Sequence, residues 1–146
     1  MSAFWDDYPA FVHRTNVPLK QEFGRLASQL HWSKQQKRVQ WLRCAQEEFK
    51  HHFGRDEKGL AGWQAMCALV EVHEIPDSVA GCKRLLKDNI WVNIFDLLDA
   101  QRMGKLAKRH DSARALGKYC RDTRRIFPKH EAKANPFLRV LLVEVF

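Results

Sequence analysis

Basic side chains are concentrated in the last third of the chain, at spacings that suit contact with a row of phosphate groups. The residues concerned are Arg102, Lys105, Lys108, Arg109, Arg114, Lys118, Arg121, Arg124, Arg125 and Lys129. Arg114, Lys118, Arg121 and Arg125 follow at steps of four, three and four, which places them on one side of a helix. Like charges at this spacing repel each other, and a polyanion would relieve the repulsion. We therefore predict that these residues contact nucleic-acid phosphates and set affinity rather than sequence preference.

The distribution of charge along the chain supports the same prediction. Residues 101–146 contain 12 basic and 4 acidic side chains, whereas residues 1–100 contain 13 of each, so the formal net charge of +8 comes from the last third. A stable core does not require such segregation. A solvated helix face is the alternative for any single basic helix. An acidic segment of a partner protein is the alternative ligand.

A second candidate site lies between Phe23 and Phe53, where two helical patterns are separated by a very short turn. The second pattern begins with Lys34, Lys37 and Arg38, whose side chains could read base edges if the pair were a helix-turn-helix. Any antiparallel helix pair with a short loop gives the same pattern. We therefore treat these three residues as secondary candidates for binding nucleic acid.

Residues suited to metal binding or catalysis occur, but not at the spacings that such sites use. The two groups of metal-ligating side chains are Cys44, His51 and His52, and Cys67, His73 and Cys82. Neither group has the spacing of a zinc site. Asp96 and Asp99 could bind a metal but are better explained as helix-surface acids or N-terminal capping partners. The chain lacks a phosphate-binding glycine loop and a nucleophile motif. We therefore predict a protein without catalytic residues, metal or cofactor.

The elements that must position these residues are all predicted to be helices. Only 7 Gly and 5 Pro occur, which does not suit the many turns of an all-β fold. Apolar residues recur at helical spacing over 18–31, 34–53, from 60 to about 75, from 79, over 90–100, over 111–123 and over 137–146. For 90–100 a strand is the alternative, because this stretch is rich in Ile, Val and aromatic residues, but the residues that follow favour a helix. The expected fold is an all-α bundle of six or seven helices, with residues 1–17 as an aromatic arm and 18–146 as a single helical domain.

The helical pattern also predicts the core and one alternative function. The expected core residues are Leu19, Phe23, Leu26, Leu42, Phe49, Trp63, Leu85, Trp91, Phe95, Leu98, Leu116, Tyr119, Phe137 and Leu141. The closing segment is apolar on most sides, so it is either buried in the chain or paired with a second copy. A protein-interaction module, binding an acidic or apolar partner segment or forming a homodimer, is therefore the alternative to a nucleic-acid-binding protein.

Several short motifs resemble those of a group of small, uncharacterised helical proteins encoded in fungal genomes. They are Phe4, Tyr8 and Phe11 near the start, Glu22–Ala27, His31-Trp32, and the later stretches NIFDLLDAQR and KHEAKANPFLRVLL. The resemblance implies a helical fold but no activity, cofactor or site residue. The four cysteines lack a paired motif, and no membrane span or signal sequence is evident. We expect reduced thiols and an intracellular, nuclear protein without a membrane partner.

Overall fold

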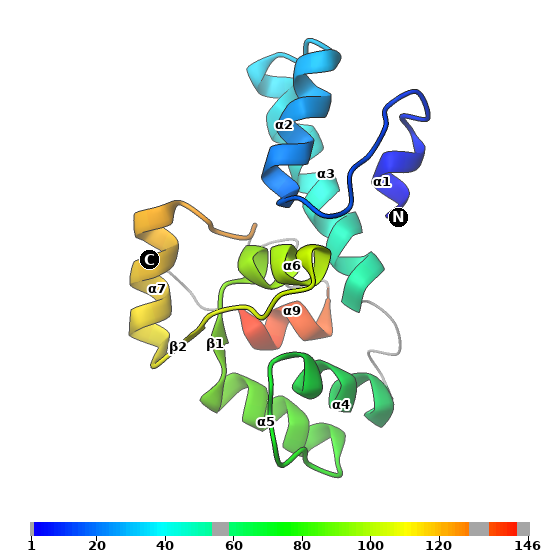
Figure 1. Ribbon diagram of the computed structural model, residues 1–146. Coiled ribbons are helices and arrows are strands. Elements are labelled where there is room, and N and C mark those ends of the chain that lie inside the picture. Colours follow the sequence, from blue (N-terminus) through cyan, green and yellow to red (C-terminus); the bar gives the residue numbers. More distant parts are fainter. Residues whose placement is uncertain (1, 54–58, 129–134, 143–146) are drawn as a thin grey trace.

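The computed structural model describes residues 2–53, 59–128 and 135–142, which form eight helices and one two-stranded antiparallel sheet (Figure 1). The elements in chain order are α1 (Ala3–Asp6), α2 (Leu19–Gln29), α3 (Lys34–Phe53), α4 (Leu60–Leu69), α5 (Val79–Asn89), β1 (Trp91–Val92), α6 (Ile94–Met103), β2 (Arg109–His110), α7 (Ala113–Thr123) and α9 (Pro136–Leu141). The prediction of a predominantly helical fold is confirmed. Within the described ranges, no helix is long and apolar enough to cross a membrane.

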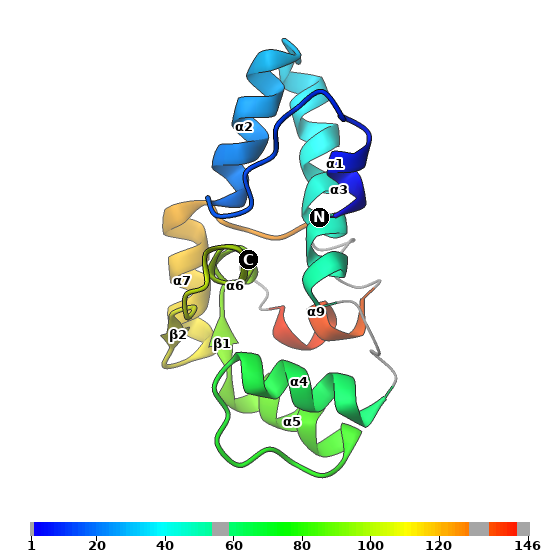
Figure 2. The same cartoon turned by 45° about the vertical axis from the view of Figure 1, so that its right-hand side comes forward.

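The N-terminal aromatic residues pack against the body of the molecule. Phe4 and Trp5 on α1 are buried, and α1 contacts α3. The ring of Trp5 stacks on that of Phe11 at 5.9 Å, and the ring of Phe4 lies 6.1 Å from Phe23 on α2. The first residues therefore cover one side of the α2–α3 pair (Figure 2).

Helices α2 and α3 form a hairpin at one end of the molecule (Figure 1). His31 adopts a positive φ of 53° in the turn, and Ser33 directly precedes α3. The Ser33 hydroxyl accepts from the Gln36 amide while the Gln36 side chain accepts from the Ser33 amide, which is a capping box. These local interactions explain why the observed bounds of α3 match the predicted ones.

The chain between Ile90 and Ala100 differs from its prediction as one continuous helix. Trp91 and Val92 instead form β1, which pairs with His110 and Arg109 of β2. Asn93 then caps α6, its side-chain oxygen accepting from the Asp96 amide. Large aromatic and β-branched side chains suit a strand, and an Asn at an N-cap favours the start of a helix.

Helices α4, α5 and α9 pack together at the other end of the molecule (Figures 1 and 2). Asn135 caps α9, and Phe137, Leu138 and Leu141 on that helix are buried. These three side chains of the closing segment are therefore covered by their own chain, whereas Val140 and Leu142 are only partly buried. Residues 143–146 of that segment lie outside the described residues.

One apolar cluster links most of the elements. All of the predicted core residues are buried except four, which are only partly buried, namely Leu42, Leu85, Trp91 and Tyr119. The four cysteines are free thiols and all are buried, in agreement with the expectation of reduced side chains. Burial, and then the neighbouring Cys82, raise the pKa of Cys67 to about 12, so its thiol stays protonated.

Candidate nucleic-acid interface

Arg102, the first of the predicted phosphate contacts, is buried and holds three segments of the chain together. Its guanidinium pairs with Glu48 on α3 and donates to the carbonyl oxygens of Val17 and Arg14, each at 2.8 Å. The side chain is 2% exposed. The structure does not support Arg102 as a phosphate contact, because its guanidinium is buried and is bonded to a carboxylate and two carbonyl oxygens of the protein.

Arg125 is likewise held within the protein. Its Nε donates to Asp96 at 2.9 Å and its Nη2 to Asp99 at 2.8 Å, both on α6. Tyr119 donates to the other oxygen of Asp96 at 2.6 Å, and burial followed by this bond raises the pKa of Tyr119 to about 12. Asp99 also accepts from the Leu19 amide at 2.9 Å, so it caps α2 from a distant helix. The Arg125 side chain is 25% exposed, but its charge is neutralised by two carboxylates, so the structure does not favour it as a phosphate contact either.

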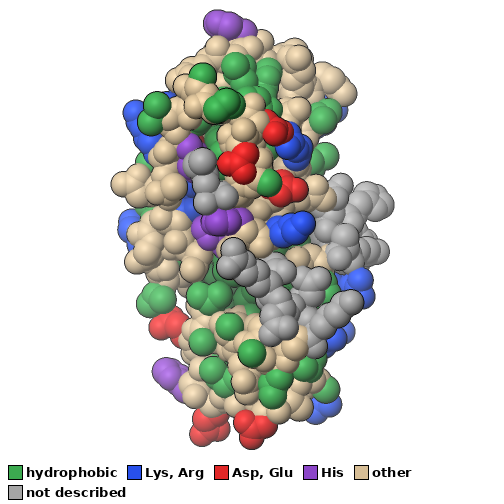
Figure 3. All heavy atoms as spheres, turned by 90° about the vertical axis from the view of Figure 1, so that its right-hand side faces the viewer, with side chains coloured by type: hydrophobic (Ala, Val, Ile, Leu, Met, Phe, Trp, Pro, Cys, Tyr) green, Lys and Arg blue, Asp and Glu red, His purple; other side chains and the backbone are tan. Residues whose placement is uncertain are grey.

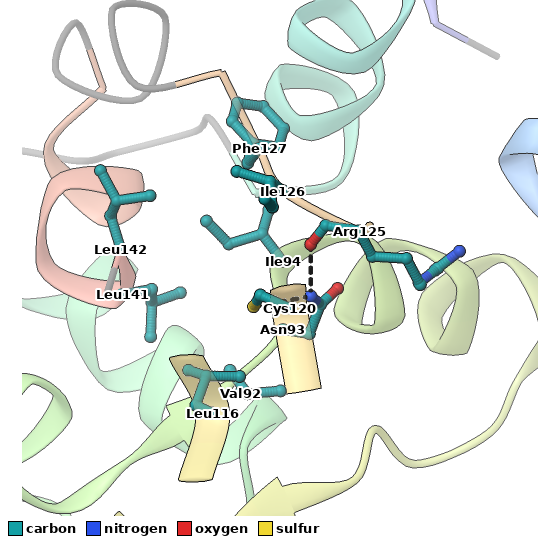
Figure 4. Close-up of a pocket in the computed structure, with 10 residues that line it drawn as sticks. All are labelled: Val92, Asn93, Ile94, Leu116, Cys120, Arg125, Ile126, Phe127, Leu141 and Leu142. Atoms are coloured by element: carbon teal, nitrogen blue, oxygen red, sulfur yellow. Dashed lines mark hydrogen bonds between the residues drawn. The ribbon is translucent and has the colours of Figure 1, made fainter. Parts of the chain in front are cut away.

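A small cavity beside Arg125 completes this junction without forming a ligand site (Figure 4). Asn93 points into it and donates to the Arg125 carbonyl oxygen at 2.7 Å. The cavity is about 20 Å³ in volume, which is room for a single water molecule. The hydrogen bond of Asn93 holds the segment that follows α7 against the start of α6.

The other predicted phosphate contacts that the structure describes are all exposed, and we term them the α7 surface. They are Lys105, Lys108, Arg109, Arg114, Lys118, Arg121 and Arg124. Lys118 pairs with Asp122 one turn along α7, and Arg109 donates to the Val70 carbonyl oxygen at 3.2 Å. Lys105 and Arg114 make no ion pair within the described part of the chain, so they remain available to an external anion. Lys129 lies outside the described residues.

A groove between α2 and α3 collects a second group of cations. The α2–α3 groove is about 410 Å³ in volume and is lined by Lys20, Phe23, Gly24, Ala27, Lys34, Lys37, Arg38 and Trp41. Four of these side chains are cationic and none is acidic. None of the four forms an ion pair with the residues that the structure describes. The three secondary candidates from the sequence thus lie together, joined by a lysine and two aromatic rings that sequence analysis did not select.

The sequence contains the residues of the groove as two sets at helical spacing, one on α2 and one on α3. Lys34, Lys37, Arg38 and Trp41 are spaced three, one and three residues apart, which is one face of a helix. Lys20, Gly24 and Ala27 show the same periodicity on α2. The pattern of either helix alone predicts only an exposed basic face. The concave site with its aromatic floor forms when the two helices pack together.

Aromatic contacts connect the groove to the end of α7. The Trp41 ring stacks on Phe95 at 5.3 Å, and the Arg125 guanidinium lies 5.9 Å from the same Phe95 ring. Helix α2 lies above α7 on one side of the molecule (Figure 2). Asp99 on α6 accepts hydrogen bonds from the Leu19 amide at the start of α2 and from Arg125 beyond the end of α7. The two cationic surfaces are thus linked through α6.

A polar cavity on another side of α3 is the main alternative site. It is about 230 Å³ in volume and is lined by Ser2, His13, Thr15, Glu48, His51, His52, Gln101 and Arg102. Burial would raise the pKa of Glu48, but the hydrogen bond from His52 and the charge of Arg102 outweigh it and lower that pKa to about 2. Glu48 is thus a fixed anion rather than a base that could exchange protons near neutral pH.

The surroundings of this cavity also differ from those of the groove. Within the described ranges, no group of three or more His, Cys, Asp or Glu side chains could hold a metal ion. Burial, and then the charge of Arg102, lower the pKa of His13, so its ring is neutral at pH 7. The face that carries α1 and the end of α3 mixes acidic, basic and histidine side chains, without a field of one sign (Figure 3).

Comparison with known proteins adds no family, relative or solved structure to these observations. No protein-family model, no curated protein and no solved structure matches the chain. The candidate interface therefore depends on the geometry and charge of its own residues.

Proposed function

We propose that this protein binds nucleic acid without catalysing a reaction, through the α7 surface together with the α2–α3 groove. The observation that supports it is the pairing of charges. Arg102 and Arg125 are matched by carboxylates, whereas Lys20, Lys34, Lys37 and Arg38 gather around one groove that no acidic side chain lines. Clustered unpaired cations repel each other, so an anion bound among them gains favourable interactions with all of them.

Phosphate is the anion that suits both surfaces. Lysine and arginine side chains contact phosphates regardless of base sequence, and each neutralised phosphate releases counterions. Four cations in the groove would give a slope of about −3 in a plot of log affinity against log salt for a single strand. Exposed members of the α7 surface would increase that slope further.

The direct test is to titrate fluorescein-labelled single-stranded and duplex oligonucleotides by anisotropy at several salt concentrations. We expect binding that weakens steeply as salt rises. The double variant Lys105→Glu/Arg114→Glu should weaken binding at low salt and flatten the salt dependence. Binding that ignores salt, or no binding at low salt, would contradict the proposal.

A matched control distinguishes the loss of affinity caused by removing local contacts from that caused by changing the net charge. Arg84 and Lys87 are exposed on α5, at the opposite end of the molecule from the groove (Figure 1). The double variant Arg84→Glu/Lys87→Glu changes the net charge by the same amount as the α7 variant. It should reduce affinity much less, because long-range steering is screened within about 10 Å at moderate salt.

A further inference from the structure

We propose that the α2–α3 groove binds one unpaired base of a single-stranded nucleic acid, with its phosphate held by the lysines and arginine around it. This inference rests on the proposed function and deepens it, because it names the form of nucleic acid. Its parts are the floor, the rim and the open space at Gly24, all of which belong to two adjacent helices.

The floor of the groove is aromatic. Phe23 and Trp41 line it, with ring centroids 5.1 Å apart and planes inclined at 60°. Trp41 is supported from behind by Phe95, which stacks on it at 5.3 Å. Trp41 is only partly buried, so part of its ring remains accessible from the groove. Every nucleobase has a flat π face, so such a floor accepts a base without selecting its identity.

The rim of the groove is cationic on both helices. Lys20 comes from α2, and Lys34, Lys37 and Arg38 come from the first turns of α3. A ligand that is flat and apolar in one part and anionic in another matches this combination, and a nucleotide has that form. The volume of about 410 Å³ falls within the range of about 300–1,000 Å³ for small-molecule pockets, which suits one nucleotide rather than a helix.

The concave shape favours a single strand over a duplex. In a duplex the bases are stacked, and only their edges can be reached from the grooves. A protein that reads a duplex inserts a convex helix, whereas the residues that line the α2–α3 groove face one another across a hollow. A base can enter the hollow only if it is unpaired, as in recognition of single strands on aromatic side chains.

Gly24 gives a way to close the groove without disturbing the fold. It lies within α2 and lines the groove, and a Cβ atom added to it would have no heavy atom within 4 Å. Gly24→Leu therefore places an apolar side chain into the hollow and replaces a poor helix former with a good one. Gly24→Ala adds only a methyl group, and Gln21→Leu introduces the same leucine at an exposed position of α2 that does not line the groove.

The experiment measures binding of wild type and these three variants to an oligo-dT of about 15 nucleotides and to a duplex of similar length. We expect Gly24→Leu to weaken binding to the single strand by about fivefold or more, with little change for the duplex. Gln21→Leu should bind both ligands like the wild type, and Gly24→Ala should show a smaller loss than Gly24→Leu. Circular dichroism and thermal melting check that each variant is folded.

The outcomes separate this inference from the proposed function. If Gly24→Leu binds the single strand as tightly as the wild type does, while the salt dependence is retained, the inference is overturned and the proposed function stands. If the wild type binds neither oligonucleotide, both are overturned. Binding of an acidic, tyrosine-rich peptide that Gly24→Leu weakens, with no oligonucleotide binding, would instead assign the groove to a protein partner.

A second readout reports contact with the floor. Stacking of a base on an indole ring quenches its fluorescence, and Trp41 is the indole that lines the groove. We expect oligo-dT to quench wild-type emission and Trp41→Phe to lose most of that quenching. Equal quenching in Trp41→Phe would place the base elsewhere and overturn the inference.

Discussion

Two groups of cations in this molecule have opposite environments. Arg102 and Arg125 come from the strongly basic last third, yet both pair with carboxylates from residues 1–100, namely Glu48, Asp96 and Asp99. Lys34, Lys37 and Arg38 come from the formally neutral first hundred residues, yet they line a groove without an acidic side chain. The comparison shows that charge segregated along a sequence is redistributed when the chain folds.

The redistribution is seen in the ion pairs. Three carboxylates from the first hundred residues pair with two arginines from the last third, and none of them pairs with the cations of the α2–α3 groove. The positive charge left without an ion pair is therefore found on the hairpin of α2 and α3 as well as in the last third. Buried ion pairs are stable only with good geometry and additional hydrogen bonds, and Arg102 adds two bonds to carbonyl oxygens to its pair with Glu48.

The largest expected difference between the two groups is in stability. Arg102→Met should lower the free energy of unfolding by about 3–5 kcal/mol, because it leaves the buried Glu48 carboxylate without its cation. Arg114→Met, at an exposed arginine on α7, should change it by less than about 0.5 kcal/mol. Urea denaturation of both variants measures the difference. Equal effects would show that Arg102 does not hold the three segments around it together.

Acid should weaken the same buried network. The folded-state pKa of Glu48 is about 2 against an ordinary value of 4.5. A lowered carboxyl pKa stabilises the fold above pH 4.5, and this contribution disappears as the pH falls from 4.5 to 2. The loss is about 3 kcal/mol for this group alone. Urea unfolding over that pH range measures it.

The control for the acid prediction removes the titrating group. Glu48→Gln should be less stable than wild type at neutral pH, and its unfolding free energy should fall less steeply between pH 4.5 and pH 2. If wild type and variant lose stability in parallel, the acid dependence comes from other carboxyl groups.

The smallest expected effects are on the free energy of unfolding, at two glycines that differ in backbone conformation. Gly24 lies within α2, whereas Gly104 follows α6 at a positive φ of 66°, and neither has an atom close to an added Cβ. Gly24→Ala should raise the unfolding free energy by about 0.5–1 kcal/mol, because alanine is the better helix former. Gly104→Ala should lower it by about 1 kcal/mol, because alanine is strained in that conformation. Thermal melts of both variants measure the two signs, and a shared sign would contradict this explanation.

Local features of the fold were predictable because they depend on residues close together in the chain. The Ser33-Gln36 capping box and the helical spacing of the following apolar residues define α3 without reference to the rest of the protein. For the β1 segment the local pattern left both a helix and a strand open. Trp91 and Val92 form a strand because Arg109 and His110 lie beside them, and such pairing is not visible in a local pattern.

The candidate site was only half predictable, for a related reason. Lys34, Lys37 and Arg38 were identified as candidates from their positions at a helix start. Lys20 and the aromatic floor were missed because they join the site only when α2 folds back on α3. Arg102 was misassigned because its partner lies 54 residues away in the sequence.

The sequence by itself determined that the chain is helical, where most helices begin and end, and that the molecule carries an excess of positive charge. Those properties follow from short-range periodicity, capping and composition. The tertiary structure decided which cations are neutralised and which remain open to an anion. That choice depends on distances between side chains far apart in the chain, and those distances exist only once the helices have packed.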